Sequence, residues 1–295
     1  MTTILQVIIS GLMIGSIYGI ISIGITLIYG TLRIVNFAYG EFLMLSMYLT
    51  FWIVQFVPIN PYLAMIPVAL IMFLIGTGVF WFLVRPLVGK KSRLLILLTV
   101  GLSFTFQNLA LTLWTADFRK VSTGLENNVI RLGSVSISVS QLIAFGFSIL
   151  FAASLFLFLN YTRTGRAVRA VSQERRAAQL MGININRIYT FTYGLGIALA
   201  GVAGMIISPI YYAFPTCGAS FSILACIVVV MGGLGSFGGA LISGLIIGLI
   251  EVLSGYFISP SLNQAVYFLM FIVLILVRPA GLFGLGVGSE EVGFD

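Results

Sequence analysis

The sequence predicts an all-α integral membrane protein, a polytopic bundle of eight or nine membrane segments with one broken, re-entrant, glycine-rich element. The first observation is composition: of 295 residues, 60% are hydrophobic and 8% are charged. Soluble domains carry about 25% charged residues, so this chain cannot cover a surface in water. The second observation is that continuous apolar runs recur, each long enough to cross a bilayer as a helix. Because these runs do not alternate with polar residues, the strands of a membrane barrel are not expected.

Seven apolar runs are each interpreted as one span, and together they predict a single transmembrane domain over residues 1–295. The first run has no basic segment before it and no small-residue cleavage site, so we expect a retained span and not a signal peptide. The runs cover residues 4–29, 38–57, 62–84, 94–116, 139–159, 188–210 and 262–277.

An eighth apolar block, residues 221–257, is too long for one straight span and is interrupted at 232–239 by Gly-Gly-Leu-Gly-Ser-Phe-Gly-Gly. We interpret it as a re-entrant half-helix followed by a full span. The interruption matches the glycine spacing of a dinucleotide-binding loop, but that motif requires a strand–loop–helix context, which an apolar membrane run does not supply. A break in a membrane helix exposes backbone polar groups, tolerated only inside protein or along a cavity. Gly232, Gly233 and Gly235 are therefore either a structural bend or part of a transport pathway.

Basic residues predict which loops share a side of the membrane. The loops 85–93 and 160–187 hold 10 of the 15 basic residues, and two spans separate them. Cytoplasmic loops are enriched in Lys and Arg, so both loops are expected in the cytoplasm. Counting spans from there places the N-terminus and the loop 117–138 outside, and Arg33 and the C-terminus inside.

Small residues recur every four positions in the first span and near the C-terminus. In lipid, such stripes let two helices approach closely. We expect them to be packing surfaces, or positions where helices slide during a transport cycle. They are Gly11, Gly15 and Gly19, and Ala240, Gly244 and Gly248.

The residue inventory argues against catalysis by this chain. There is no His, the usual general base and a common metal ligand, and the two cysteines, Cys217 and Cys226, cannot form a four-ligand metal site. Gly89-Lys90 lacks both the earlier Gly and the following Ser or Thr of a phosphate-binding loop. We expect no cofactor bound by this chain, and ATP hydrolysis would require another polypeptide. The net charge of +7 is small, and we expect no nucleic-acid binding.

Two acids lie in or beside apolar segments, where a charge costs about 2.5–3.5 kcal/mol at a helix centre. Asn36 and Gly40 suit a non-helical link after the first span, which places Glu41 at the start of the second helix, where the helix dipole favours an acid. Glu41 is either a cap paired with Arg33 or a gate in a pathway. Glu251 lies deeper, and packing against a polar neighbour and lining a pathway are equally supported.

The loop 160–187 is the most informative polar segment. Residues 166–181 are predicted to form a short amphipathic helix that Gly182 ends. Such a helix either rests on anionic headgroups or docks into a groove of a partner protein. Its apolar face would carry Ala167, Val171, Ala178 and Met181, and its polar face Arg166, Arg169, Gln173 and Arg176.

Four segments together resemble the permease subunits of branched-chain amino acid ABC importers, of the LivH type, over nearly the whole chain. One position departs from the pattern, because the family usually has His where this chain has Tyr39. The segments are Gly24–Phe42, Ala225–Gly244, Arg278–Gly284, and Arg166–Gly182 followed by Ala-Gly-Val-Ala-Gly at 200–204.

The resemblance implies a subunit of the bacterial inner membrane that forms half of a translocation pathway. A periplasmic binding protein would deliver branched-chain amino acids, a second, LivM-type permease would complete the pathway, and two ATPase subunits holding ATP and Mg would drive it. The residues implied in coupling to an ATPase are Arg166, Arg169, Glu174, Arg176, Ala177, Ala178 and Gly182. The candidate pathway or gate residues are Asn36, Tyr39, Gly40, Glu41, Gly232, Gly233, Gly235 and Glu251.

Two alternatives stay open at this point. Relatives of such permeases serve urea, amides and aromatic acids, so the same importer class with another substrate is one. The other is a self-sufficient secondary carrier, which requires titratable groups within its spans. Two glutamates and no His supply few such groups for proton coupling.

Overall fold

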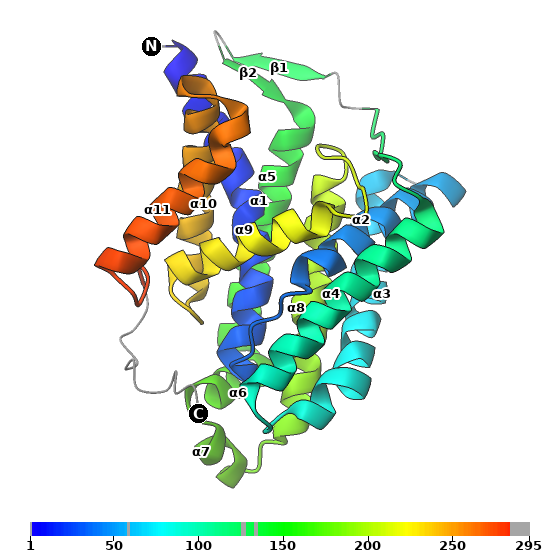
Figure 1. Ribbon diagram of the computed structural model, residues 1–295, viewed down its shortest axis with the longest axis vertical. Coiled ribbons are helices and arrows are strands. Elements are labelled where there is room, and N and C mark those ends of the chain that lie inside the picture. The colour runs from blue at the N-terminus through cyan, green and yellow to red at the C-terminus, as the bar shows by residue number, and fades with distance from the viewer. Residues whose placement is uncertain (1, 58–59, 125–127, 133–134, 284–295) are drawn as a thin grey trace.

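The computed structural model describes residues 2–57, 60–124, 128–132 and 135–283 (Figure 1). Within these residues, seven helical segments are long and apolar enough to cross a membrane, which confirms the predicted all-α polytopic class. The spans are α1 (Thr2–Leu32), Pro61–Leu87 around α3, α4 (Ser92–Trp114), α5 (Val139–Tyr161), α8 (Ile185–Ile207), α10 (Phe237–Phe257) and Pro260–Val277 around α11.

The span around α3 (Met65–Val79) is assembled from several helical types. A 3₁₀ turn, Pro61–Ala64, precedes α3, and a π-helical turn, Phe80–Val84, follows it. A second 3₁₀ turn, Arg85–Leu87, closes the span where Pro86 removes a backbone donor. Near the C-terminus, a 3₁₀ turn, Pro260–Leu262, leads into α11 (Asn263–Val277).

Two further helices belong to the bundle but are not among the seven candidate spans. α2 (Tyr39–Phe56) has 18 residues, and α9 (Cys217–Gly232) is a shorter apolar helix of 16 residues. In Figure 1, α9 runs obliquely across the front of α1, whereas α1 and α10 run side by side. The predicted interruption of the block 221–257 is thus the turn between α9 and α10.

The two glycine stripes predicted from sequence pack directly on each other. A Cβ atom added to Gly15 would lie 2.7 Å from the Cα of Leu245, and one added to Gly11 would lie 2.8 Å from the Cα of Leu249. From the other side, a Cβ on Gly248 would overlap the backbone of Gly15. The stripes therefore let the α1 and α10 backbones touch, which is the close approach that drives helix association in lipid.

α8 lies at the centre of the bundle, in contact with α1, α2 and α3. Its glycines face these neighbours: a Cβ on Gly196 would meet Ile28 of α1, one on Gly204 would meet Ser46 of α2, and one on Gly201 would lie 2.9 Å from Met72 of α3. Nearly every α8 residue from Tyr193 onward is buried. This helix is the scaffold on which the candidate site is built.

Contacts show which loops lie at the same end of the bundle, and this grouping agrees with the prediction. The Gln6 side chain donates a hydrogen bond to the Ser136 carbonyl at 3.5 Å, so the N-terminus and the segment after α4 share one end. Arg85 and Arg187 line one pocket, so the two basic loops share the opposite end. The segment after α4 holds an antiparallel pair that was not predicted, β1 (Val129–Leu132) and β2 (Val135–Ser138).

The prediction of a single amphipathic helix over residues 166–181 is wrong. The structure has two helices there, α6 (Arg163–Gln173) and α7 (Arg175–Leu180), at the end of the molecule opposite the N-terminus (Figure 1). Glu174 between them is extended, with φ −148° and ψ 104°, and its side chain accepts a hydrogen bond from the Arg176 N–H at 3.2 Å. Helix α7 thus has its own N-cap, which requires the backbone to leave the helical conformation at Glu174.

Candidate functional site

The link between α1 and α2 is non-helical, as predicted, and it is tied to α8. Asn36 is buried, and its side-chain oxygen accepts a hydrogen bond from the Ala38 N–H at 3.0 Å. Its amide nitrogen donates to the Tyr193 hydroxyl at 3.0 Å. One side chain therefore fixes the local turn and anchors it to the central helix.

Tyr39, at the position where His was expected from the resemblance, is a second anchor. The side chain is fully buried, and its hydroxyl donates to the Gly196 carbonyl at 3.2 Å. A Cβ atom on Gly24 would overlap this hydroxyl, so Tyr39 fills the space that the α1 glycine leaves. The residue joins α1, α2 and α8 through one buried ring.

Glu41 is fully buried, and its partners come from α4, whereas Arg33 is exposed. Its Oε1 atom accepts hydrogen bonds from the Gln107 amide at 2.6 Å and from the Ser103 hydroxyl at 3.1 Å. Its Oε2 atom has no hydrogen-bond partner in the described structure. Ser103 and Gln107 were missed from sequence, although two polar residues four apart in an apolar span are a usable signal.

The starts of α2 and α9 meet at this carboxylate. The Gly40 N–H donates to the Ser222 hydroxyl at 2.7 Å, and that hydroxyl donates to the Phe37 carbonyl at 3.0 Å. A Cβ atom on Gly218 would overlap the Oε2 atom of Glu41. Since helix N-termini carry partial positive charge, the two helix starts stabilise an acid that lacks a basic partner.

α4 carries a second polar row beside the one that contacts Glu41. Thr105, Asn108 and Thr112 are exposed, together with Gly101, at spacings of four, three and four residues that place them on one helical face. Each polar side chain donates a hydrogen bond of 2.8 Å to its own helix, four residues back. This chain leaves a polar face of a spanning helix uncovered.

The second intramembrane acid, Glu251, belongs to a different cluster. It interacts with Tyr18 of α1, with Tyr211 of the α8–α9 loop and with Tyr267 of α11. Its Oε2 atom is buried and has no hydrogen-bond partner among the described residues. The structure thus groups Glu251 with tyrosines and does not bring it to Glu41.

The predicted glycine-rich break lies at the far end of α9 from Glu41, about 24 Å away along a 16-residue helix. Gly233 and Gly235 have φ angles of +94° and +88°, which favour glycine. The carbonyls of Met231 and Gly232 accept hydrogen bonds from the Leu282 and Phe283 N–H groups at 2.7 and 3.3 Å. The C-terminal segment therefore satisfies the backbone groups that the break frees.

The candidate coupling residues lie on α6 and α7. Arg166 and Arg169 are exposed on α6, whereas Val168 and Val171 are buried. On α7, Ala178 is buried, and Glu174, Arg176 and Ala177 are exposed. Gly182 ends α7 with φ +81°, as predicted.

The tip of α7 is apolar and uncovered. Leu180 is 88% exposed, and Met181, predicted on the apolar face of the single helix, is 83% exposed. The break at Glu174 rotates α7 relative to α6, so Met181 falls off the apolar face that a continuous helix would have had. Two large apolar side chains are therefore exposed at the end of a short helix that begins with Arg175 and Arg176.

Comparison with known proteins decides the class of this membrane protein. Residues 7–277 match the family described as "Branched-chain amino acid transport system / permease component". The chain belongs to this permease family. The match overlaps every predicted membrane segment, and it confirms the resemblance inferred from sequence.

Individual relatives of this branched-chain permease family cover nearly the same length. The high-affinity permease LivH of Escherichia coli (strain K12) is 32% identical, over 95% of both chains. The high-affinity permease BraD of Pseudomonas aeruginosa is 30% identical, also over 95% of both. The probable permease LivH of Methanocaldococcus jannaschii is 26% identical, over 90% of this chain and 88% of its own. No solved structure matches the chain.

Proposed function

We propose that this chain forms half of the translocation pathway of an ATP-driven importer for branched-chain, hydrophobic amino acids. Its relatives LivH and BraD are high-affinity branched-chain amino acid permeases, which supports the substrate class. The exposed polar face of α4 supports the proposal that this chain forms only one half of the pathway. The hydroxyls of Thr105 and Thr112 are bonded within their own helix, but hydrocarbon cannot satisfy the second N–H and the side-chain oxygen of Asn108, so a second permease or a water-filled path covers this face.

The partners follow from this role. A second, homologous permease of the LivM type completes the pathway, and a periplasmic binding protein delivers the substrate. Two ATPase subunits hold ATP and Mg, so this chain binds no cofactor and catalyses no reaction. The α6–α7 pair, with Arg166, Arg169, Arg176 and the exposed Leu180–Met181 tip, seats on one ATPase.

The chain is one transmembrane domain of the bacterial inner membrane, with α2 and α9 as its eighth and ninth membrane elements and α9 as the short, re-entrant one. The clustering of the two basic loops at one end supports a cytoplasmic position for α6–α7. The N-terminus and the β1–β2 pair then lie outside, and the end of α11 lies inside.

Glu41 gates the pathway where α2, α4 and α9 meet. Asn36, Tyr39 and Gly40 hold the gate on α8 and α9, and closure of the ATPases reaches it through α6, which contacts α1, α5 and α8. Such a transmission switches the gate between outward-open and inward-open states. Gly232, Gly233 and Gly235 act as the bend between α9 and α10, and Glu251 acts at a separate polar position.

The experiment is co-purification of the tagged chain in mild detergent, with mass spectrometry of the copurified proteins, followed by reconstituted uptake of labelled leucine. We expect two ATPases, a second permease and ATP-dependent leucine uptake stimulated by the binding protein. Recovery of the chain alone, with uptake that needs no ATP, would establish a secondary carrier instead. Uptake of urea, an amide or an aromatic acid but not of leucine would overturn the substrate class.

A further inference from the structure

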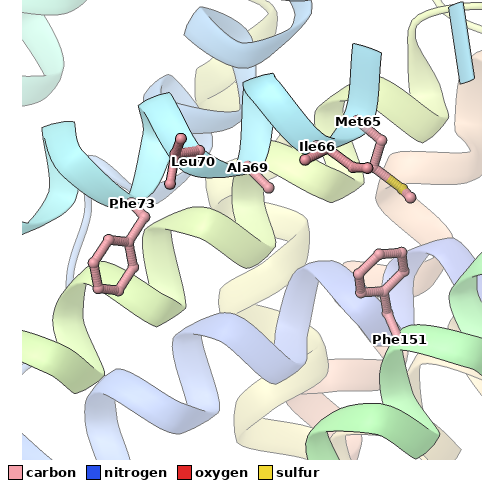
Figure 2. Close-up of a pocket in the computed structure, with 6 residues that line it drawn as sticks. All are labelled: Met65, Ile66, Ala69, Leu70, Phe73 and Phe151. Atoms are coloured by element: carbon pink, nitrogen blue, oxygen red, sulfur yellow. The ribbon is translucent and has the colours of Figure 1, made fainter. Parts of the chain in front are cut away.

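A groove runs along one side of α3, from the middle of the bundle to the end that carries the basic loops. Its inner part is a pocket of about 380 Å³ lined only by apolar residues. Figure 2 shows these side chains: five project from α3, and Phe151 faces them from α5. They are Met65, Ile66, Ala69, Leu70, Phe73 and Phe151.

The outer part of the groove is a second pocket of about 490 Å³ that shares Phe73 with the first. The Phe73 ring meets Phe191 of α8 edge-on, with centroids 5.9 Å apart, and these two rings form the floor between the pockets. Toward the end of the bundle the lining becomes polar and basic. Its residues are Phe73, Thr77, Trp81, Arg85, Asn184, Asn186, Arg187, Thr190 and Phe191.

Two arginines define the charge of this outer pocket. The Arg85 guanidinium lies 3.9 Å from the centre of the Trp81 ring, which holds it at the mouth of the groove. Arg187 lies in the first turn of α8, which Asn184 caps by accepting from the Arg187 N–H at 3.1 Å. The pocket has no acidic lining residue, so it concentrates positive charge, and the α8 helix dipole has the same sign.

The outer pocket, from Arg85 to Phe73, matches one leaflet of a bilayer in length. Arg85 and Phe73 are 12 residues apart, which is about 18 Å along a helix. Half of a hydrocarbon core of about 30 Å is about 15 Å. An anion held by Arg85 and Arg187 would therefore lie at headgroup level, about one leaflet from Phe73, with the rings of Trp81, Phe191 and Phe73 lining the way between.

We propose that the outer part of this groove binds one anionic phospholipid, with its phosphate between Arg85 and Arg187 and one acyl chain along Thr77 to Phe73, where the apolar pocket begins. The charge complementarity selects an anionic head, and the aromatic rings of Trp81, Phe73 and Phe191 select a lipid over a soluble anion. Because the lipid contacts the span around α3 and α8 together, it stabilises their packing. This site is separate from Glu41 and does not depend on the transported substrate.

The test uses the co-purified complex, delipidated in detergent, with phosphatidylglycerol or phosphatidylcholine added back. Bound lipid is counted by native mass spectrometry, and the shift in melting temperature is measured in parallel. We expect phosphatidylglycerol to bind and to raise the melting temperature, and phosphatidylcholine to do neither. The double variant Arg85→Gln, Arg187→Gln should bind phosphatidylglycerol about thirtyfold more weakly.

The matched charge control is Lys90→Gln, Lys91→Gln, which removes two positive charges from the same end outside the groove and should bind as the wild type does. The double variant Arg85→Lys, Arg187→Lys keeps the charge and should retain most of the binding. Retained binding would show that the Gln variant loses binding through its lost charge and not through lost folding. Equal phosphatidylglycerol binding by the Gln variant of the arginines and by the wild type would overturn the proposal. So would absence of binding by the wild-type complex, as expected if a partner subunit covers the groove.

A second pair of variants tests the acyl-chain channel. Thr77→Trp adds bulk inside the groove, and Gly78→Trp adds the same bulk at the next position, which lines neither pocket and where a Cβ meets nothing within 4 Å. We expect Thr77→Trp to lose phosphatidylglycerol and Gly78→Trp to keep it. Inorganic phosphate or glycerol phosphate should leave the melting temperature unchanged. A shift with either anion equal to that with the lipid would identify a soluble-anion site and overturn the lipid assignment.

Discussion

Glu41 is an acid held inside a membrane protein, and among the described residues no basic side chain lies against it. A buried carboxylate is tolerated when hydrogen bonds and dipoles replace the water it has lost. Gln107 and Ser103 supply the hydrogen bonds at 2.6 and 3.1 Å, and the starts of α2 and α9 supply the dipoles. The remaining oxygen, Oε2, is buried against Gly218 and has no hydrogen-bond partner in the described structure.

Glu41→Gln should slow leucine uptake about tenfold while the complex still assembles. The amide has the same shape and can accept from Gln107 and Ser103, but it lacks the charge that attracts a substrate ammonium group. The measurement is initial uptake into proteoliposomes at equal amounts of complex. Asp117→Asn, which removes a carboxylate outside the spans, is the control and should transport normally; a wild-type rate in Glu41→Gln would remove the residue from the pathway.

At the scale of elements, the break at Glu174 divides the proposed coupling segment into two helices with different surroundings. α6 is anchored, since Val168 and Val171 are buried against the bundle. α7 is short, and it presents Arg176 beside the uncovered Leu180 and Met181. A partner seated on this segment therefore contacts basic side chains at its edge and apolar ones at its tip, the arrangement typical of protein interfaces.

The double variant Arg169→Glu, Arg176→Glu should uncouple ATP hydrolysis from transport. Reversing two exposed charges sets like charges against an acidic partner surface and weakens docking, while the buried side of α6 is untouched. Uptake should fall about tenfold or more, and ATPase activity should lose its stimulation by the binding protein. Lys90→Glu, at the same end of the bundle but in the other basic loop, is the matched control. Unchanged coupling in the double variant would place the ATPase contact elsewhere.

At the scale of the whole molecule, two long-range backbone contacts hold the C-terminal third in place. α10 packs on α1 through the paired glycine stripes, and residues 282–283 donate hydrogen bonds to the end of α9. The second contact involves only main-chain atoms. It is therefore open to a test that changes one donor and little else.

Leu282→Pro should lower the melting temperature of the purified complex, and Leu282→Ala should lower it much less. Proline removes the N–H that donates to the Met231 carbonyl at 2.7 Å, and a buried acceptor left without a partner costs about 1–3 kcal/mol. Alanine keeps that N–H and loses only side-chain contacts. Equal melting temperatures for the two variants would show that this hydrogen bond does not stabilise the fold.

Local chemistry explains which features could be predicted from the sequence. Continuous apolar runs identify spans, the polar residues after Leu32 identify a link, and Gly182 ends a helix whatever lies around it. The small-residue stripes predicted close packing, and the structure supplies the partner of each. In the site, Asn36, Gly40 and Glu41 were selected because polar groups are conspicuous beside apolar helices.

Features that depend on distant residues or on fine cap chemistry were not predicted. Ser103 and Gln107 lie 62 and 66 positions from Glu41, and no periodicity connects them to it. The break at Glu174 depends on a glutamate acting as N-cap, a position that Ser, Thr, Asp and Asn usually occupy. Strands β1 and β2 have four residues each, too few for an alternating pattern to stand out.

The hydrogen bonds from residues 282–283 to the end of α9 also impose an order on biosynthesis. A ribosome releases α9 about 50 residues before the segment that satisfies its last carbonyls, and by then α10 and α11 have already been made. The last carbonyls of α9 therefore gain these partners only after both following helices have been synthesised.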